Sequence, residues 1–408
     1  MMSKVKILND PVYGFISIPY GIVFDLVEHP YFQRLRRIKQ VSLTHYVYPG
    51  ALHTRFHHAL GAYHLTCQAI DVLRSKGTEI TAAEAEAVGI AILLHDIGHG
   101  PFSHTLEHTL INITHEQLSV MIMEKLNQEF EGKLSLAIEI FNNRYHKHFL
   151  HQLVSGQLDM DRMDYLNRDS FFTGVSEGVI GYDRIIKMLA VHNNHLVVEE
   201  KGIYSIEKFL IARRLMYWQV YLHKTVLSAE QMMIQVLRRA KMLRHRGIKL
   251  GVQGSLNYFL ENTFTQQDFS KNKSILLDRF ASLDDTDIAF AIKGWQNHFD
   301  PVLSFLAKSL ISRRLFKLEF QDQAPRQDDI NFIRQKIEKQ FPFSKDVANF
   351  LLIVGKETNT AYSTSKEEIL ILLKTGEVKP MSLVSNHGIQ PKMFTKHYLC
   401  YPKEIIKE

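Results

Sequence analysis

The spacing of apolar residues along the chain predicts a mainly helical protein. From Pro30 onward, apolar residues recur at helical intervals with arginines and lysines between them, at Phe32, Leu35, Ile38 and Val41. A second predicted helix follows a Gly/Pro-containing loop. One face of this helix carries five residues, His58, Ala62, Leu65, Ala69 and Val72. Residues at this spacing lie on the same side of a helix, so His58 is expected to face the core.

The same periodicity predicts further helices over residues 84–96, 104–130, 134–150, 158–169 and roughly 206–246, and it continues to about 345. The opening KVKILNDPVYGFISIP and the segment 195–207 have the turn signals of hairpins, and the tail beyond Asn349 resembles short strands. We therefore expect a mainly α, multi-helical core over residues 1–250. A helical C-terminal lobe with small β extensions is expected over residues 251–408, because the long helix breaks near Gly247.

Composition is typical of a soluble globular protein, with 45% hydrophobic and 23% charged residues. The longest apolar run is about eight residues, too short to cross a bilayer, and the N-terminus lacks the apolar segment of a signal peptide. Cys67 and Cys400 are the only cysteines, which excludes a disulfide framework and a cysteine-based zinc site. The sequence predicts a cytoplasmic protein without a membrane partner.

The net charge of +6 and the pI near 9.0 suit phosphate-bearing ligands, although an ordinary basic surface has the same values. Lysine and arginine form no single long tract, and no nucleic-acid-binding motif is recognisable. The most basic stretch, RRAKMLRHRGIK (238–249), ends a predicted long helix and is typical of a solvated face or a subunit contact. Nucleic acid is therefore not the expected partner.

Histidine is the unusual residue in this composition. The chain has 21 histidines, and nine of them lie between residues 53 and 115. The stretch HDIGHGPFSH (95–104) directly follows the apolar run AVGIAILL, which places His95 and Asp96 at the end of a buried helix, where Gly98 is expected to end the turn. Buried unpaired charges cost several kcal/mol each, so a bound metal ion is the economical explanation.

Four residues on three predicted helices are the candidate metal ligands: His58, His95, Asp96 and Asp161. Taken singly, His58 is more often a satisfied core histidine, and Asp161 is more often a helix cap. Together, two imidazoles and two carboxylates without a thiolate suit Mn, Fe, Mg, Ni or Zn, and they leave positions open for water and substrate. The set predicts a divalent metal cofactor.

These motifs resemble those of the HD-domain phosphohydrolases. Within that superfamily, the chain is similar to the deoxynucleoside triphosphate triphosphohydrolases related to the vertebrate sterile-alpha-motif-and-HD-domain enzyme. The matching runs are NDPVYG (9–14), FQRLRRIKQ (32–40), YPGALHTRFHHALG (48–61), LLHDIGHGPFSH (93–104), THEQ (114–117), DMDRMDYLNRD (159–169) and YLHK (221–224). The resemblance covers roughly residues 5–245, and a weaker match follows at RRLFK (313–317).

The resemblance implies metal-dependent hydrolysis of deoxynucleoside triphosphates (dNTPs) to deoxynucleoside and inorganic triphosphate. It implies that the four candidate ligands bind the metal, and that His115 is the general acid with His104 and Glu107 beside it. The implied substrate contacts are Arg55, Arg162, Tyr165 and Arg213 for the phosphates, Gln40 and Asp169 for the sugar, and Tyr221 for the sugar–base wall. Independently of the resemblance, helical spacing predicts that four residues share one helix face: Arg213, Tyr217, Tyr221 and Lys224.

Three positions depart from the vertebrate pattern. His57 stands in place of an acidic residue, Glu107 in place of an aspartate, and Arg162 in place of a lysine. Arginine presents a flat fork of donors where lysine presents a point charge, so the phosphate geometry is expected to differ. These changes bear on substrate preference more than on the type of reaction.

The resemblance also implies regulation by a guanine nucleotide, GTP or dGTP, in a homo-oligomer that is a dimer or a tetramer. The positions matching the guanine-specific part of that site are Lys6, Ile7, Asn9, Glu28, Gln33 and Arg36. The positions matching the phosphate contacts of a second nucleotide are Arg184, His223, Lys224, Arg313 and Lys317. A surface helix with solvated arginines is the alternative interpretation.

Two other functions remain open at this point. The same metal ligands serve HD phosphodiesterases and nucleotidases that act on monophosphates, cyclic nucleotides or alarmones. A nucleotide-sensing protein with weak catalysis is the alternative from another class. The three phosphate-facing arginines favour a triphosphate, and the general-acid candidate His115 favours catalysis over sensing.

Overall fold

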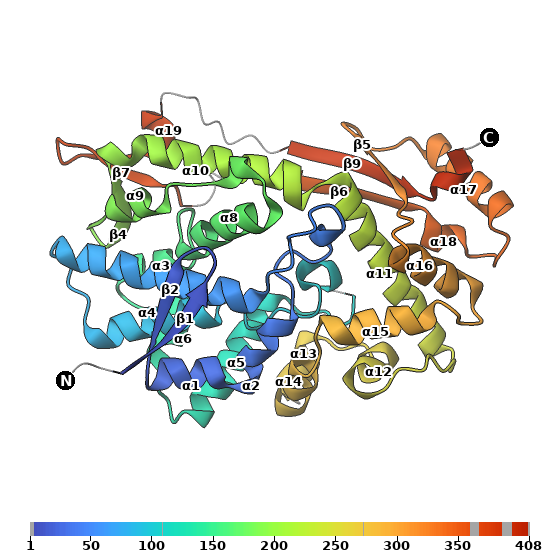
Figure 1. Cartoon of the computed structure of the whole chain (residues 1–408), viewed down its shortest axis with the longest axis horizontal. Coiled ribbons are helices and arrows are strands. Elements are labelled where there is room, and N and C mark those ends of the chain that lie inside the picture. The colour runs from blue at the N-terminus through green and yellow to red at the C-terminus, as the bar shows by residue number, and fades with distance from the viewer. Residues whose placement is uncertain (1–3, 108, 272, 360–366, 386–393, 407–408) are drawn as a thin grey trace.

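The structure is a computed structural model that describes residues 4–107, 109–271, 273–359, 367–385 and 394–406. Helices make up most of it, and the strands form three small sheets (Figure 1). The predicted class, mainly α with small β extensions, is confirmed. No helix in these ranges is both long and apolar enough to cross a bilayer.

The N-terminal hairpin is formed as predicted. Strands β1 (Val5–Asp10) and β2 (Gly14–Pro19) pair antiparallel, and the Asp10 carboxylate accepts hydrogen bonds from two backbone amides of the turn. Helix α1 (Ile22–Glu28), which the sequence pattern did not predict, follows. Helix α2 (Pro30–Gln33) begins at the expected proline but passes into a 3-10 turn over Arg34–Arg37, so the predicted extension to Val41 is wrong.

The centre of the fold is a group of helices around α3 (Arg55–Ser75), which packs against α4 (Ala82–Leu94) and α8 (Met160–Thr173). Helices α5 (His115–Glu129), α6 (Ser135–Phe141) and α7 (His148–Val154) cover it. Two predicted helices are therefore wrong in extent. In the described residues between 103 and 114, a short 3-10 turn over Ser103–Leu106 precedes Thr114, which caps α5. The segment 134–150 divides into α6 and the start of α7.

The predicted hairpin at 195–207 begins earlier in the chain. Its strands are β3 (Leu189–His192) and β4 (His195–Glu199), which follow α9 (Tyr182–Lys187). The long helix expected over 206–246 is two helices, α10 (Ile203–Met216) and α11 (Lys224–His245), joined by a widened turn over Tyr217–Tyr221. In that turn the Leu222 amide bonds to the Tyr217 carbonyl five residues back, at 2.7 Å.

The C-terminal part adds helices α12 (Gly254–Glu261), α13 (Gln266–Lys271), α14 (Lys273–Ala281), α15 (Asp285–Trp295), α16 (Pro301–Ile311), α17 (Gln327–Gln340) and α18 (Ala348–Leu351). Strands β5 (Lys317–Gln321), β9 (Phe394–Tyr401) and β6 (Ile353–Asn359) form an antiparallel sheet in that order. Strand β5 lies in a segment predicted to be helical, which is a further correction. Strands β7 (Leu370–Leu372) and β8 (Val378–Pro380), followed by α19 (Met381–Val384), extend the β3–β4 hairpin into a four-stranded sheet.

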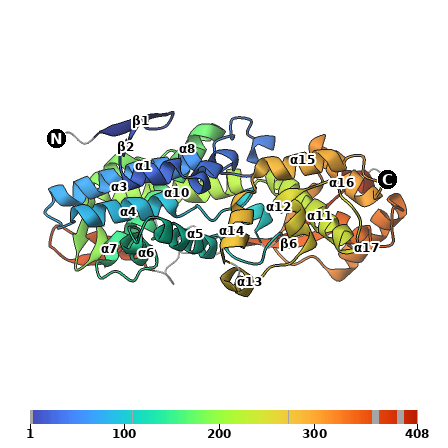
Figure 2. The same cartoon turned by 90° about the horizontal axis from the view of Figure 1, so that it is seen from below.

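One hydrophobic core runs through both halves, from Ile16 to Ile405. Seen from below, the helices of residues 20–175 lie at one end and α12 to α17 at the other, with α11 among the latter (Figure 2). The division into regions 1–250 and 251–408 stays a prediction.

Candidate active site

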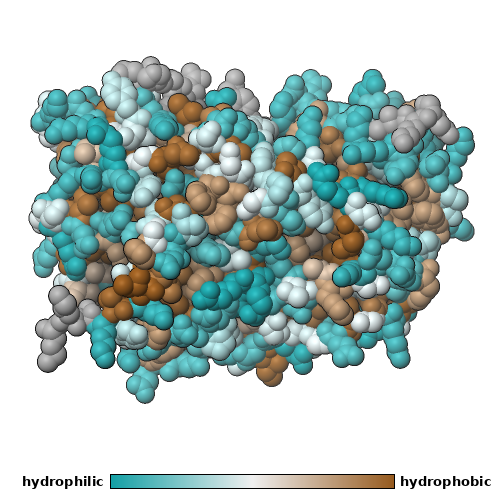
Figure 3. All heavy atoms as spheres, in the orientation of Figure 1, coloured by the Kyte–Doolittle hydropathy of each residue, from teal (hydrophilic) through white to brown (hydrophobic). Residues whose placement is uncertain are grey.

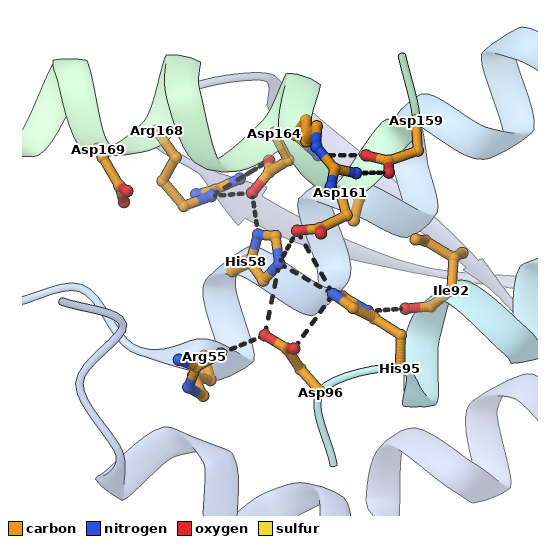
Figure 4. Close-up of polar contacts among 12 residues, drawn as sticks. Arg55, His58, Ile92, His95, Asp96, Asp159, Asp161, Asp164, Arg168 and Asp169 are labelled. Atoms are coloured by element: carbon orange, nitrogen blue, oxygen red, sulfur yellow. Dashed lines mark hydrogen bonds and ion pairs between the residues drawn. The ribbon is translucent and has the colours of Figure 1, made fainter. Parts of the chain in front are cut away.

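The four predicted metal ligands converge from three helices (Figure 4). His58 comes from α3, His95 and Asp96 follow the last turn of α4, and Asp161 lies in the first turn of α8. The Nε2 atoms of His58 and His95 are 3.3 Å apart, and Asp161 Oδ1 lies 3.2 and 3.5 Å from them. The Asp96 carboxylate lies 3.6 Å from His58 Nε2 and 3.4 Å from His95 Nε2. This geometry brings nitrogen and oxygen donors to one point.

The hydrogen bonds on the outer side of both imidazoles set their tautomers. His58 Nδ1 is 2.7 Å from Asp164 Oδ2, and His95 Nδ1 is 2.6 Å from the Ile92 carbonyl oxygen. Both partners accept, so each Nδ1 carries a proton, and each Nε2 faces the Asp161 carboxylate. Without a metal ion, Nε2 would donate a proton to that carboxylate; with one, its lone pair would be the ligand. Burial lowers the pKa of His58, but its hydrogen bonds to Asp161 and Asp164 raise it to about 10. The cluster therefore attracts positive charge, and its donor set fits a divalent metal ion.

A buried ion pair holds the Asp164 carboxylate in place. Arg168 donates to it (Nε to Oδ2, 3.0 Å) and also to Asp10 (Nη1 to Oδ2, 2.7 Å). A side chain at Gly61 of α3 would place its Cβ 2.0 Å from Asp164 Oδ1, so only glycine lets α8 approach this closely. The sequence analysis missed both members of the pair. Their spacing of three and seven residues from Asp161, along one helix face, is the signal that would have found them.

The general-acid candidate lies beside the metal site at the start of α5. His115 Nδ1 is 3.1 Å from Glu107 Oε1, and the same oxygen accepts the His115 backbone amide at 2.8 Å. The imidazole stacks on His99, with ring centroids 3.9 Å apart, and His99 Nε2 is 3.3 Å from Asp96 Oδ1. His99, which the sequence analysis did not single out, thus joins the acid candidate to a metal ligand. The side chain of His104 is outside the described part of the structure.

Gly98 has a different role from the predicted one. Helix α4 ends at Leu94, and Gly98 is absent from the residues with positive φ, so it is not a helix-terminating glycine. A Cβ on Gly98 would lie 2.2 Å from the His115 carbonyl oxygen and 2.4 Å from the Ser119 amide nitrogen. The absent side chain lets the first turn of α5, which carries His115, lie directly against the metal-binding turn.

A cavity of about 670 Å³ opens beside the metal ligands, within the usual size of small-molecule sites. Its wall contains every substrate contact that the resemblance implies, namely Gln40, Arg55, Arg162, Tyr165, Asp169, Arg213 and Tyr221. It also contains Glu107, His115, Asp96 and Asp161, so two predicted catalytic residues and two of the predicted metal ligands share this space with the substrate contacts. Additional residues come from α11 and β6, including Glu230 and Glu357.

The three arginines in the cavity wall differ in how their donors are used. Arg55 donates to Asp96 through Nη1 and to Ser103 Oγ through Nε at 2.8 Å, and Arg162 pairs with Asp159. Within the described structure, Arg162 Nε and both Nε and Nη1 of Arg213 are buried without a hydrogen-bond partner. Buried donors of this kind normally have an acceptor, so these arginines are prepared for an anionic ligand.

Other residues of the cavity wall carry groups suited to a sugar and a base. The Tyr221 hydroxyl donates to Asp169 Oδ2 at 2.6 Å, and His53 Nε2 is 2.6 Å from Asp169 Oδ1. Gln40 Oε1 is a buried acceptor without a partner in the described residues. The widened turn after α10 brings Tyr217 edge-on to Tyr221, with ring centroids 5.3 Å apart, so both rings line the cavity.

Glu230 provides a pH-dependent test of the cavity wall. Burial raises the pKa of this carboxyl from 4.5 to about 7, against hydrogen bonds from Thr105 and Ser42 that lower it. Because the pKa of Glu230 is higher in the folded than in the unfolded protein, its contribution to folding stability is fully present below pH 4.5. That contribution is lost as the pH rises through about 7, where the buried carboxyl must ionise. The free energy of unfolding of Glu230→Gln is therefore expected to exceed that of wild type by about 1–3 kcal/mol above pH 7.5 and to match it near pH 4.5.

Urea titrations at both pH values measure the difference. Exposed Glu86 on α4 is the matched control, because Glu86→Gln is expected to behave as wild type throughout. A constant difference between Glu230→Gln and wild type at both pH values would contradict the expected ionisation.

The residues matched to the guanine-specific regulatory site lie on the outside of the N-terminal region. Lys6, Ile7 and Asn9 are exposed on β1, and Glu28 is exposed at the end of α1. Gln33 donates to the Val27 carbonyl and accepts from Arg36 Nε at 2.8 Å, so these residues contact one another. The Arg36 guanidinium lies 3.6 Å from the centroid of the Phe56 ring.

The residues matched to the second nucleotide are spread over the chain. Lys224 and Lys317 lie on α11 and β5, which pack together, and His223 caps α11. Arg313 donates to the Tyr46 carbonyl oxygen. Arg184 is on α9, far from β5 (Figure 1). One chain therefore does not bring all five together.

Comparisons with known proteins agree with the geometry. Residues 55–169 match the model of the HD domain, and residues 180–249 match that of the HD associated region. A phosphohydrolase of Bacteroides thetaiotaomicron, solved by crystallography, is 51% identical with a TM-score of 0.94, over 98% of this chain and 100% of that one. The uncharacterized protein YwfO of Bacillus subtilis is 31% identical over 99% of this chain and 94% of its own length.

The similarity to a named dNTP hydrolase is partial. The deoxynucleoside triphosphate triphosphohydrolase SAMHD1 of Homo sapiens is 30% identical over 55% of this chain and 42% of that enzyme. The full-length matches, the HD-domain match and the cluster of His58, His95 and Asp161 agree with one another. The chain belongs to the HD-domain phosphohydrolases.

Proposed function

We propose that this phosphohydrolase converts dNTPs to deoxynucleoside and inorganic triphosphate. The observation that carries the proposal is the set of buried N–H groups without a partner on Arg162 and Arg213. They lie in the wall of the cavity that two proposed metal ligands, Asp96 and Asp161, also line. With Arg55, they provide three cationic side chains, which suits a chain of phosphates better than a single phosphate. The partial similarity to SAMHD1 supports the same substrate class.

The metal would be held by His58, His95, Asp96 and Asp161. A divalent ion in such a site supplies an acidified water and polarises a phosphoryl oxygen. The arginines bind the triphosphate and balance the charge that develops on it. His115, held at Nδ1 by Glu107, donates a proton from Nε2 to the departing 5′-oxygen.

Other residues of the cavity wall would hold the deoxynucleoside. Gln40 Oε1 accepts a hydrogen bond from a sugar hydroxyl, and Asp169, fixed by Tyr221 and His53, accepts another. Tyr221 gives the sugar an apolar surface and lies edge to face with Tyr165 of the phosphate contacts, with ring centroids 6.2 Å apart. Hydrogen-bonding groups and aromatic surface together favour a nucleotide over inorganic polyphosphate.

Two neighbouring arginines on α10 test the phosphate site. Arg213 is buried against the cavity, and Arg214 is exposed. Arg213→Ala is expected to lower kcat/KM for dNTPs by about 10- to 100-fold, because a hydrogen bond to a charged group contributes about 1.5–3 kcal/mol. Arg214→Ala is the matched control and is expected to keep wild-type kinetics. Equal kinetics for both variants would contradict the proposed phosphate contact.

The reaction products separate the proposal from its alternatives. Purified protein is incubated with each dNTP and each candidate metal, and the products are resolved by ion-exchange chromatography. Inorganic triphosphate together with deoxynucleoside is the expected pair. Orthophosphate from monophosphates would indicate a nucleotidase, whereas saturable binding of dNTP without turnover would indicate a sensor.

We further propose that GTP or dGTP activates the enzyme by assembling a homo-oligomer. The hairpin carrying Lys6, Ile7 and Asn9 exposes several apolar side chains, with Ile7 58% and Phe15 70% exposed. Figure 3 shows hydrophobic surface in the region of this hairpin. Apolar surface left open in one chain suits contact with a second copy. A carboxylate such as Glu28 suits the N–H groups of guanine.

Added GTP is expected to raise both the hydrolysis of other dNTPs and the mass measured by light scattering, because a nucleotide that bridges subunits stabilises the assembly. Arg36→Ala should reduce both effects, whereas Arg144→Ala, at another exposed position, should not. Equal activity and mass with and without GTP, using protein verified to be nucleotide-free, would contradict the proposed activation.

A further inference from the structure

A second group of metal-binding side chains lies away from the active site. It joins His148, the first residue of α7, His195, the first residue of β4, and Glu367, which precedes β7. His148 Nε2 is 3.1 Å from Glu367 Oε2, and His195 Nδ1 is 3.0 Å from Glu367 Oε1. One ligand atom from each residue lies within 4.8 Å of the others. The group combines two imidazoles and one carboxylate.

Neighbouring polar groups orient these ligands. His148 Nδ1 lies 2.7 Å from Asn143 Oδ1, an acceptor, so the proton is on Nδ1 and the Nε2 lone pair faces the Glu367 carboxylate. Gln152 Nε2 donates to Glu367 Oε1 at 2.7 Å and fixes the carboxylate. In neutral His148 this lone pair would bind a cation together with the carboxylate, whereas a protonated His148 would donate to Glu367 as an ordinary ion pair. Supporting hydrogen bonds of this kind are the usual second layer of a metal site.

The backbone holds the two histidines at this distance by independent contacts. The Asn194 side chain donates to the His146 carbonyl at 2.7 Å, and the Phe149 amide donates to the Asn194 carbonyl at 3.1 Å. Gln152 Oε1 also accepts the Leu196 amide at 2.6 Å. These bonds attach the β3–β4 turn to the start of α7, so the imidazole pair is formed before any ion binds.

We propose that His148, His195 and Glu367 bind a second divalent ion, for which Zn²⁺ is the best match. Two nitrogen donors and one carboxylate, with a fourth position for water, form a tetrahedral zinc set. The side chains are 23%, 44% and 43% exposed, so the site is open to ions from solution. It is distinct from the cluster around His58, because its residues come from α7, β4 and the segment before β7.

The ion would attach the C-terminal part of the chain to the HD core. Strand β7 pairs in parallel with β4, from Val197 with Leu370 to Glu199 with Leu372, and Glu367 enters just ahead of this pairing. Figure 1 shows β7, coloured red, beside the green β4 at the end of the molecule opposite the C-terminus. Zinc would therefore fix the start of β7 and strengthen the four-stranded sheet.

Zinc content and thermal stability test this proposal independently of catalysis. After dialysis against micromolar zinc, His195→Ala should contain one zinc equivalent fewer than wild type by elemental analysis. Zinc should raise the Tm of the variant less than that of wild type. The matched control is His192→Ala, on the same hairpin, which should retain the wild-type zinc content. Glu367→Gln keeps the hydrogen bond with Gln152 but removes the anionic ligand. It should lower zinc affinity by more than about 100-fold, because loss of a residue that only hydrogen-bonds to a ligand already lowers metal affinity by about 10–100-fold.

Circular dichroism verifies that each variant is folded. Equal zinc content and equal zinc-dependent Tm in wild type, His195→Ala and Glu367→Gln would overturn the proposal and leave the group as ordinary ion pairs. Loss of one equivalent in His192→Ala as well would also overturn it, because binding would then reflect surface histidines in general.

Discussion

Asp96→Ala is expected to abolish both metal binding and hydrolysis. The Asp96 carboxylate faces His58 Nε2 and His95 Nε2 and also pairs with Arg55. Its removal takes one of two anionic donors from the site and leaves the Arg55 guanidinium without its acidic partner, so the remaining residues no longer neutralise a divalent ion. We expect turnover below detection and loss of the active-site metal equivalent, measured by elemental analysis on the protein used for kinetics.

The matched control is Asp71→Ala, an exposed aspartate on α3, the helix that also carries His58. This variant should keep wild-type metal content and turnover. Full occupancy and normal activity in Asp96→Ala would show that Asp96 is not a ligand. Because the site proposed at His148 and His195 does not involve α4, the metal lost in Asp96→Ala and in His195→Ala should be additive in the double variant.

His115→Ala is expected to retain the metal and lower the rate by about 10²–10⁴-fold, the usual contribution of a positioned general acid. The contacts of His115 include Glu107, Glu116 and His99, and it belongs to a different side-chain group from His58, His95 and Asp161, so its removal is expected to leave the metal donors in place. The expected signature is a lower kcat with little change in dNTP affinity. Rapid-quench kinetics and equilibrium binding with the same protein separate the two quantities.

A substrate with a better leaving group provides the control for this role. Such a substrate needs less protonation, so the difference between His115→Ala and wild type should become smaller with it. If His115→Ala loses its metal, His115 is a metal ligand. If its rate falls by the same factor with every leaving group, His115 positions the substrate and is not the general acid.

The burial of three proposed metal ligands was predictable from the sequence because each belongs to a local pattern. His58 recurs with apolar residues at helical spacing, and it is fully buried in α3. His95 and Asp96 follow an uninterrupted apolar run, which forms the buried α4. These features depend on residues within one or two helical turns, so periodicity alone identifies them.

The errors in the predicted fold arise where tertiary contacts override periodicity. Residues 104–114 have helical spacing, but Asn112 pairs with the backbone near Thr265 and Thr114 caps α5 anew. Strand β5 lies in a segment with helical spacing, and it is a strand because its backbone hydrogen bonds are made with β9. Such pairings join residues more than 70 positions apart, beyond the reach of a local pattern.

The sequence by itself determined the mainly helical class, the burial of the histidine-bearing helices and the chemical type of the ligand set, because these follow from local spacing and side-chain chemistry. Only the tertiary structure decided which donors lack partners. The unpaired N–H groups of Arg213 and the position of Glu230 in the cavity wall depend on several helices meeting at one place. The approach of Glu367 to His148 depends likewise on the chain returning to the core after more than 200 residues. Burial without a partner is a property of the packed chain, and it is the packed chain that specifies where a phosphate or a second metal ion is expected to bind.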